Sequence, residues 1–176
     1  TICAAADLVR PADPDLIPVA HTVLQYLNDI EGTYCLSGQE EKYGGTTGHA
    51  EKCEHRTGKW PAIRGWDIRL DNPDPSNEAE RYWHNNGLPT FSWHMGAPPS
   101  SDSYDNSKKY VAIDDVLKEG STENSSYMNK LSSMARRLKR LEQRGVPVLW
   151  RPFHECDGEE GNRDGPVWFW WSKSGP

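Results

Sequence analysis

One short tract of the sequence concentrates residues that could do acid–base chemistry. Residues 149–155 read LWRPFHE, so a carboxyl group directly follows a Trp, a Phe and a His. Burial among such side chains disfavours the charged carboxylate and raises its pKa. A carboxyl group of this kind stays protonated near neutral pH and can donate a proton to a leaving-group oxygen. The tract therefore predicts a general acid/base at Glu155.

Aromatic and imidazole side chains elsewhere in the chain could hold a sugar beside that carboxyl group. The tryptophans of WFWW at 168–171 offer flat apolar faces to the C–H faces of pyranose rings, and His94 and His154 could hydrogen-bond to hydroxyl groups. The structural alternative is a buried Glu155 paired with Arg151 in a Trp-rich core, because ion-pair networks also perturb pKa values.

Strands and helices alternate along the chain and would bring these side chains together. We expect strands at 33–37, 61–67, 88–93 and 146–153, and helices at 17–30, 77–86 and 127–141, with one further helical turn at 113–118. Residues 43–59 read as a loop because they are rich in Gly, Thr and charge. Parallel βα units place polar residues on the face formed by the C-terminal ends of the strands. Asp67 and His94 follow two of these strands, so we expect both near Glu155.

The number of βα units is small for a complete barrel. We count four, whereas a full (β/α)8 barrel takes about 250 residues. We therefore predict one α/β domain over residues 1–176, built as a half (β/α)4 barrel or a truncated (β/α)8 barrel without strands five to eight. Its outer strands would have unpaired edges, and its inward-facing apolar residues would lack an opposite layer. A homodimer that closes the barrel, or a longer parent chain, would remove both problems.

Several tracts together resemble glycoside hydrolase family 26, which includes β-mannanases and some xylanases and β-glucanases. The most specific are WRPFHE at 150–155, the Asp-Gly pair at 157–158, and WFWW at 168–171. Weaker similarities are LSGQ at 36–39, RGWD at 64–67 and TFSWH at 90–94, in family order across nearly the whole chain. The resemblance implies a TIM-barrel fold and β-mannan or a related plant cell-wall polysaccharide as partner.

The resemblance also implies roles for single residues. Glu155 is similar to the family's general acid/base, and His154 to the histidine that helps to hold the nucleophile and the sugar. Trp168 resembles the tryptophan that lines the cleft, while His94 and Trp93 resemble residues that border it. Asp67, which ends the RGWD tract, is a further candidate for substrate binding.

The family's nucleophilic Glu lies on strand seven, which this chain lacks. A retaining glycosidase needs a second carboxyl group about 5–5.5 Å from the acid/base, and Asp67 or Glu40 would need a new geometry to supply it. An inverting pair of Asp67 and Glu155, about 6.5–9.5 Å apart, is a further alternative. The sequence thus favours polysaccharide binding without efficient hydrolysis. The alternatives are the N-terminal half of a retaining endo-β-1,4-mannanase and a Trp-rich domain that binds no sugar.

Composition argues against several other partners. The net charge of -6 disfavours nucleic acid and anionic membrane surfaces, and no apolar run is long enough to span a bilayer. We expect no cofactor, because the chain has neither a glycine-rich phosphate loop nor a helical zinc motif. The acidic residues in 157–164 could bind calcium, although solvated surface acids explain them better.

The cysteines bear on cellular location. Four cysteines without CxxC spacing fit a secreted protein with one or two disulfides, whose pairing the sequence leaves open. The start at Thr1 and the glycosylation sequon at Asn124 agree with an extracellular location.

Overall fold

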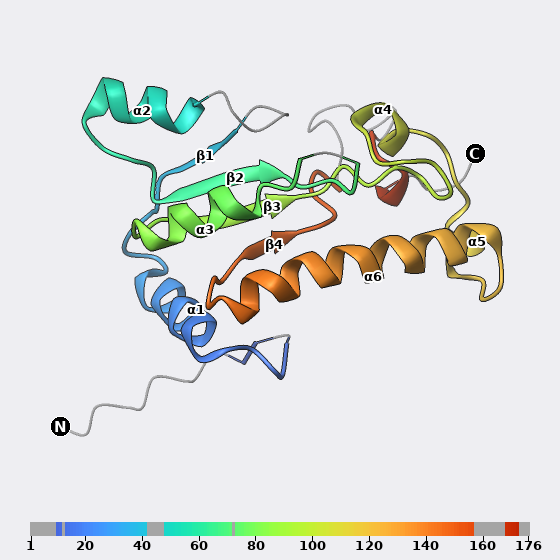
Figure 1. The fold of residues 1–176 in the computed structure, drawn as a ribbon, viewed down its shortest axis with the longest axis horizontal. Helices are drawn as coiled ribbons and strands as arrows, with labels where there is room; N and C mark the ends of the chain where they lie inside the picture. The colour runs from blue at the N-terminus through green and yellow to red at the C-terminus, as the bar shows by residue number, and fades with distance from the viewer. Residues whose placement is uncertain (1–9, 12, 42–47, 72, 157–167, 173–176) are drawn as a thin grey trace.

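Four parallel strands form the centre of the computed structural model, which describes residues 10–11, 13–41, 48–71, 73–156 and 168–172 (Figure 1). The strands are β1 (Gly38–Glu40), β2 (Ile63–Asp67), β3 (Leu88–Ser92) and β4 (Leu149–Arg151), and they pair in the order β1-β2-β3-β4. All three pairings are parallel. The predicted α/β class with parallel βα units is therefore confirmed.

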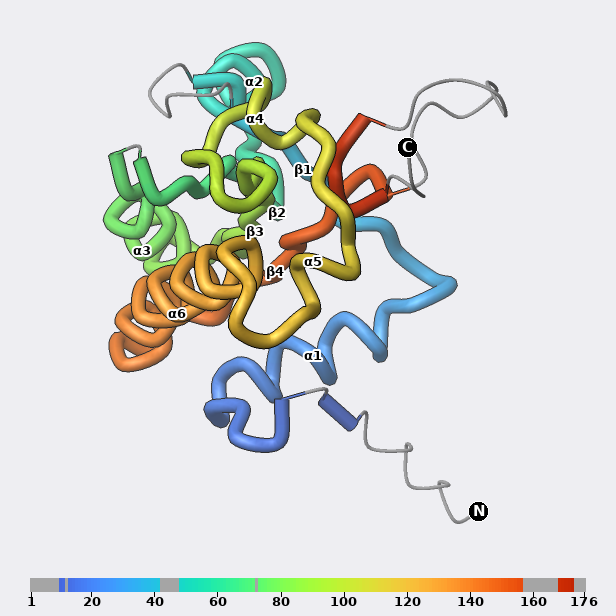
Figure 2. Tube along the Cα trace, turned by 90° about the vertical axis from the view of Figure 1, so that its right-hand side faces the viewer, coloured from blue at the N-terminus to red at the C-terminus, as the bar shows by residue number. Residues whose placement is uncertain are grey.

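Helices α3 (Ser76–His84) and α6 (Thr122–Gln143) lie together on one side of the sheet (Figure 2). The other helices are α1 (Pro18–Ile30), α2 (His49–Thr57), α4 (Tyr104–Ser107), α5 (Ile113–Leu117) and the 3-10 turn η1 (Trp170–Ser172). The core fills the space between the sheet and α3 and α6, where Trp66, Phe91 and Trp93 are almost completely buried. Burial of these large apolar side chains fixes the sheet against the two helices.

Two local predictions were wrong at the start of the chain. Residues 49–57, expected to be loop, form α2, because the Glu41 carboxylate accepts the backbone N–H groups of His49 and Ala50 at 2.9 and 3.2 Å. This distant cap replaces the local cap that sequence reasoning looks for. Gly58 then ends the helix at φ +69°. Strand β1 lies at Gly38–Glu40 rather than at 33–37, so the polar stretch itself forms the strand.

Successive side chains of a strand point to opposite faces of the sheet, and here the two faces differ in chemistry. Trp66 and Phe91 face the helices, whereas Gly65, Thr90 and Arg151 lie on the opposite face, which in a closed barrel is the interior. We expected apolar side chains on this inward face. The structure has them only near the N-terminal ends of the strands, at Ile63, Leu88 and Leu149. Toward the C-terminal ends this face is polar. Within the described chain, β1 and β4 each pair with a single neighbour and keep one unpaired edge.

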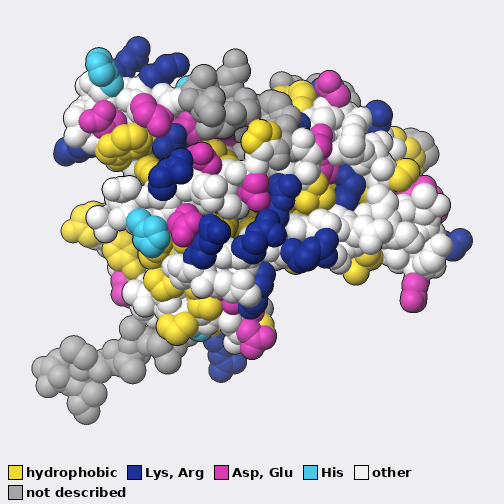
Figure 3. Space-filling model, viewed as in Figure 1, with side chains coloured by type: hydrophobic (Ala, Val, Ile, Leu, Met, Phe, Trp, Pro, Cys, Tyr) yellow, Lys and Arg dark blue, Asp and Glu magenta, His cyan; other side chains and the backbone are white. Residues whose placement is uncertain are grey.

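The surface over α3 and α6 is rich in both signs of charge (Figure 3). Arg137 and Arg140 approach Asp74 at 3.6 and 3.4 Å, and Arg144 pairs with Glu80 at 2.6 Å. These arginines therefore form an ion-paired helix face, in which Arg140 and Arg144 are about half exposed and Arg137 is mostly buried.

Cysteine pairing and membrane spanning can be checked directly over the described residues. Cys35, Cys53 and Cys156 are free thiols, so the predicted disulfides are not supported, and Cys3 lies outside the described residues. No helix in the described ranges has the length and apolar character needed to cross a membrane.

Candidate active site at the strand ends

A polar pocket of about 310 Å³ opens at the C-terminal ends of the four strands. The carboxyl ends of parallel strands meet at one edge of the sheet, so residues more than 100 positions apart in sequence line the same space. The predicted site residues Asp67, His94, His154 and Glu155 all line it. The others are Glu40, Glu41, Ser92 and Arg151.

Glu155 lies at the rim of this pocket rather than deep within it. Its side chain is exposed, so the predicted desolvation among Trp, Phe and His does not occur in this structure. Its backbone adopts φ +51°, a left-handed conformation that is uncommon for residues other than Gly. Such conformations cluster at functional sites, where surrounding contacts impose them.

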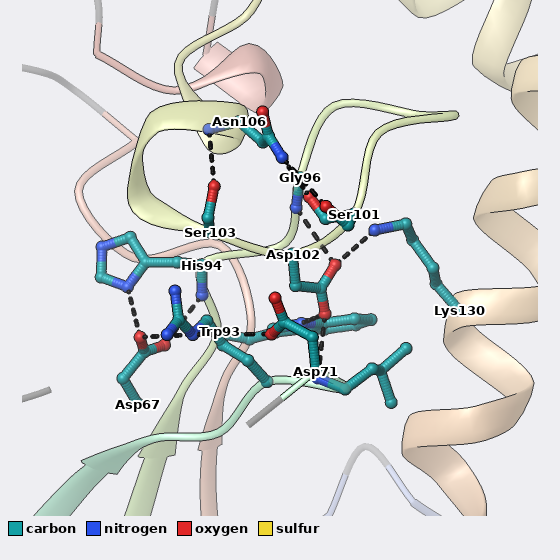
Figure 4. A network of polar contacts seen from close by, with 12 residues as sticks. Asp67, Asp71, Trp93, His94, Gly96, Ser101, Asp102, Ser103, Asn106 and Lys130 are labelled. Atoms are coloured by element: carbon teal, nitrogen blue, oxygen red, sulfur yellow. Dashed lines mark hydrogen bonds and ion pairs between the residues drawn. The ribbon is translucent and has the colours of Figure 1, made fainter. Parts of the chain in front are cut away.

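Asp67, His94 and His154 form a chain of close polar contacts behind Glu155. Asp67 Oδ1 accepts the backbone N–H of His94 at 3.0 Å, and Asp67 Oδ2 lies 3.0 Å from His94 Nδ1 (Figure 4). The Nε2 atoms of His94 and His154 are 3.3 Å apart. Burial lowers the pKa of His154 to about 4, and electrostatic repulsion from the neighbouring His94 ring lowers it further. His154 is therefore neutral near pH 7.

Glu40 also lines the pocket and is held by side chains of β3 and β4. Its carboxylate accepts the Ser92 hydroxyl at 3.2 Å and pairs with Arg151 Nη2 at 3.2 Å. Desolvation by surrounding protein raises the Glu40 pKa, and the charge of Arg151 opposes this rise. The side chain still has 43 % of its area exposed, so solvent weakens both effects.

Gly65 makes room for Glu40 over β2. A Cβ at Gly65 would overlap the Glu40 carboxylate and would approach Thr90 Cγ2 to 3.2 Å. An isolated Gly inside a strand often marks such a close approach. The sequence indicated Glu40 as a candidate second carboxylate and Gly65 as part of the RGWD tract, but it did not show that Gly65 makes room for Glu40.

The aromatic stretch 168–171 forms the wall behind His154. Phe169 and Trp171 stack at 4.6 Å between ring centroids, and Trp171 Nε1 donates to the His154 backbone carbonyl at 3.1 Å. Trp170 is buried and donates to the Met95 carbonyl at 2.9 Å. Trp168, with 36 % of its area exposed, is the one tryptophan of this stretch with a largely accessible face. It does not line the pocket, but its ring packs against Phe169, which in turn contacts His154.

Trp93 lies in the core rather than at the cleft. Ser92 faces the pocket, so alternation turns Trp93 toward the helices, where it is fully buried. Its Nε1 donates to Asp102 Oδ2 at 2.7 Å (Figure 4). Asp102 is also buried, forms an ion pair with Lys130, and accepts the backbone N–H groups of Leu70 and Gly96, each at 3.2 Å. In this structure Trp93 therefore packs in the core between the sheet and the helices and does not line the pocket.

The described side chains contain no group of three or more His, Cys, Asp or Glu residues arranged to hold a metal ion. The acidic stretch 157–164, considered above for calcium, lies outside the described residues.

Comparison with known proteins gives consistent matches. A family model described as glycosyl hydrolase family 26 matches residues 12–176. Mannan endo-1,4-β-mannosidase of Bacillus subtilis (strain 168) is 31 % identical over 186 residues, covering 94 % of this chain and 49 % of the relative. Mannan endo-1,4-β-mannosidase B of Piromyces sp. is 28 % identical and is covered to 32 %. The crystal structure of a ruminal GH26 endo-β-1,4-mannanase has a TM-score of 0.78 at 27 % identity, covering 98 % of this chain and 42 % of that chain. The chain thus spans about half the length, or less, of these relatives.

Proposed function

The chain belongs to glycosyl hydrolase family 26, and we propose that it recognises β-mannan, or a related β-1,4-glycan of plant cell walls, through the pocket around Glu155. The observation that supports this most is the convergence of Glu155, His154, His94 and Asp67 on one polar pocket. Carboxylates and imidazoles suit the hydroxyl groups of a sugar, and the accessible face of Trp168, whose ring packs against Phe169 behind His154, suits its C–H face. Two similar proteins carry the name mannan endo-1,4-β-mannosidase.

In this proposal Glu155 is the general acid/base and the described residues bind without efficient hydrolysis. Efficient cleavage needs a second carboxylate that is available to act as nucleophile or base. Asp67 is committed to the N–H group and the ring of His94, and Glu40 to Arg151 and Ser92. These partners stabilise each carboxylate where it lies and oppose its use against a sugar or a water.

Two parallel measurements test binding against hydrolysis. Retardation of the chain in a native gel that contains mannan reports binding, and reducing-sugar release from mannan reports hydrolysis. We expect retardation without release, and a loss of retardation in Trp168→Ala. Trp60 is similarly exposed, at 49 %, but it precedes β2 at the opposite end of the sheet, so Trp60→Ala is the matched control. Equal migration with and without mannan would rule out the binding function.

A second candidate function is the acid/base half of a retaining endo-β-1,4-mannanase. The exposed position of Glu155 at the pocket rim favours it, because a general acid must reach the glycosidic oxygen. The nucleophile would come from residues outside this chain. Adding the C-terminal half of the Bacillus subtilis relative tests this directly. Mannan hydrolysis that requires both halves and disappears in Glu155→Gln would establish this function, whereas a mixture as inactive as either half alone would exclude it.

The unpaired edges of β1 and β4 bear on the state in solution. We propose that a second copy can pair with these edges, because exposed strand edges favour association. Sedimentation velocity would then show a dimer, and a well-folded monomer at all concentrations would reject this proposal.

A further inference from the structure

Tyr104 is an exposed aromatic residue close to the strand-end pocket, and the function proposed above does not use it. It lies on α4, which follows β3 and lies next to His94 (Figure 4). The centroid of its ring is 5.5 Å from that of His94 and 6.2 Å from that of Phe169. The Phe169 ring also contacts Trp168, with 6.4 Å between centroids. Tyr104 therefore belongs to the same aromatic cluster as Trp168, the ring proposed to stack on a sugar.

The Tyr104 side chain is accessible, and the backbone that carries it is held in place. Tyr104 has 44 % of its area exposed, more than the 36 % of Trp168. Ser103 caps α4 by accepting the Asn106 backbone N–H at 3.0 Å, and Asn106 Nδ2 donates to the Ser101 carbonyl at 2.9 Å. A ligand that contacts the Tyr104 ring therefore has little backbone to order, which favours binding.

The Lys108 ammonium group already lies over the Tyr104 ring. Its Nζ atom is 4.0 Å from the ring centroid, well inside the distance of about 6 Å at which a cation is attracted to an aromatic face. Lys108 follows Tyr104 by four positions, so the two side chains lie on the same side of α4. Asp105 Oδ1, 3.3 Å from Lys108 Nζ, holds the ammonium group from the same short helix.

An ammonium group and a sugar compete for this ring face. The electron-rich face of an aromatic ring attracts a cation, and the C–H face of a pyranose ring stacks on the same surface. Displacement of Lys108 should cost little, because its side chain is 37 % exposed and can swing into solvent. The carboxylate of Asp105, which is 90 % exposed, can remain its partner there.

We propose that Tyr104 is a second aromatic contact for a glycan at this site, and that a bound sugar must displace the Lys108 ammonium group from its ring. This inference rests on the proposed function, because the ligand is the same β-1,4-glycan. Lys108 then acts as a built-in competitor: it covers the ring in the chain without sugar, and it lowers the affinity by the strength of the contact that has to be broken.

Lys108→Met tests the competition. Met keeps an apolar stem and removes the ammonium group, so we expect mannan to retard the variant at a concentration about two- to fivefold lower, as the strength of an exposed cation–π contact implies. Lys109→Met is the matched control, because it removes the same charge from the exposed neighbouring position. Unchanged or weaker retardation of Lys108→Met, or an equal gain in Lys109→Met, would overturn the proposal.

Tyr104→Leu tests the ring itself. Leu keeps an apolar side chain against Phe169 and removes the aromatic face, so retardation should weaken about two- to tenfold. Tyr110→Leu, at a tyrosine of similar exposure, 49 %, in the same segment, should leave retardation unchanged. Lys108→Met should bring no gain once Tyr104 is replaced, because the two side chains act through one contact. The same gain with and without the Tyr104 ring would reject the competition.

Proton NMR of the Lys108 side chain observes the displacement without any variant in the binding measurement. The ring current of Tyr104 should shift the Lys108 Cε protons upfield, and Tyr104→Leu identifies this shift by removing it. Saturation with mannopentaose should also remove it, and a shift that persists at saturation would overturn the proposal. Absence of mannan binding in the unmodified chain would reject the proposed function and the competition together. Mannan binding that is insensitive to Lys108→Met and Tyr104→Leu would reject this inference alone.

Discussion

Asp102 and Glu40 are two carboxylates at the strand ends with opposite surroundings. Asp102, behind the sheet, is almost fully buried and has four partners: Lys130, the Trp93 indole and two backbone N–H groups. Glu40, in the pocket, is 43 % exposed and has two side-chain partners. A buried charge needs hydrogen-bond and ionic partners, and Asp102 has them. Glu40 has fewer partners and remains accessible to solvent.

The comparison shows how one set of strands supplies both a rigid support and a reactive surface. Ser92 and Trp93 are neighbours in sequence, but alternation sends one to Glu40 and the other to Asp102. A fully satisfied polar network rigidifies a site, whereas a partly solvated one can exchange its partners for a ligand. We therefore expect substitutions behind the sheet to act on stability and substitutions in the pocket to act on titration and binding.

The largest expected effect is on the buried network. Asp102→Ala leaves the Lys130 ammonium uncompensated and also removes the acceptor of Trp93, so the free energy of unfolding should fall by about 3–5 kcal/mol. Urea denaturation at pH 7 measures this. Asp105→Ala removes an exposed carboxylate that also pairs with a lysine, Lys108 at 3.3 Å, and should cost less than about 1 kcal/mol. Equal losses in the two variants would break the distinction between buried support and solvated surface.

The next effect concerns His154, whose exposure is intermediate between those of Asp102 and Glu40. Its pKa, lowered by burial to about 4, is below the ordinary value of 6.5. The unfolded chain therefore binds a proton below pH 6.5 that the folded chain binds only near pH 4, and stability is lost as pH falls through this window. The loss attributable to His154 is up to about 3 kcal/mol. His154→Gln should remove that part of the slope between pH 6.5 and 4, measured by urea midpoints, while His84→Gln at an exposed site should keep it.

The sequence predicted the face on which these residues meet better than it predicted their surroundings. Strand ends and family motifs correctly placed Asp67, His94, His154 and Glu155 on one pocket, because chain order and parallel pairing determine that face. Burial depends on which neighbours pack around a side chain, and that is a tertiary property. Glu155 was therefore expected to be desolvated and is exposed, while Trp93 was expected at the cleft and is buried.

Long-range contacts explain the remaining errors. Helix α2 is capped by Glu41 from another segment, and a local reading of residues 43–59 contains no such cap. The charges within α2 did carry a signal, with Glu51 in its first turn and Arg56 in its last, an order that suits the helix dipole. The role of Gly65 likewise depends on Glu40, which lies 25 positions earlier in the chain.

A smaller effect tests how tightly the pocket side is packed. Gly65→Ala places a methyl group where the Glu40 carboxylate lies, and that flexible side chain must swing away from Arg151. We expect a loss of about 1 kcal/mol in the free energy of unfolding, at the low end for overpacking, because Glu40 can move into solvent. Gly38→Ala is the matched control, since its Cβ would meet Ile63 at an ordinary 3.6 Å. Urea denaturation of both variants measures the difference, and indistinguishable midpoints would show that Glu40 is already mobile.

The smallest expected effect is the titration of Glu40 itself. Desolvation raises its pKa above the ordinary value of 4.5, so the stability that Glu40 contributes is present below pH 4.5 and is lost as pH rises through the raised pKa. Solvent screening at a side chain 43 % exposed keeps this loss below about 1 kcal/mol, and Glu40→Gln should remove it. Carbon NMR of the Glu40 carboxyl group measures the pKa directly. Arg151→Gln removes the charge that opposes the rise, so the Glu40 pKa should increase further. A Glu40 pKa at or below 4.5 in the unmodified chain would mean that the pocket side is as well satisfied as Asp102, and the contrast between the two faces would fail.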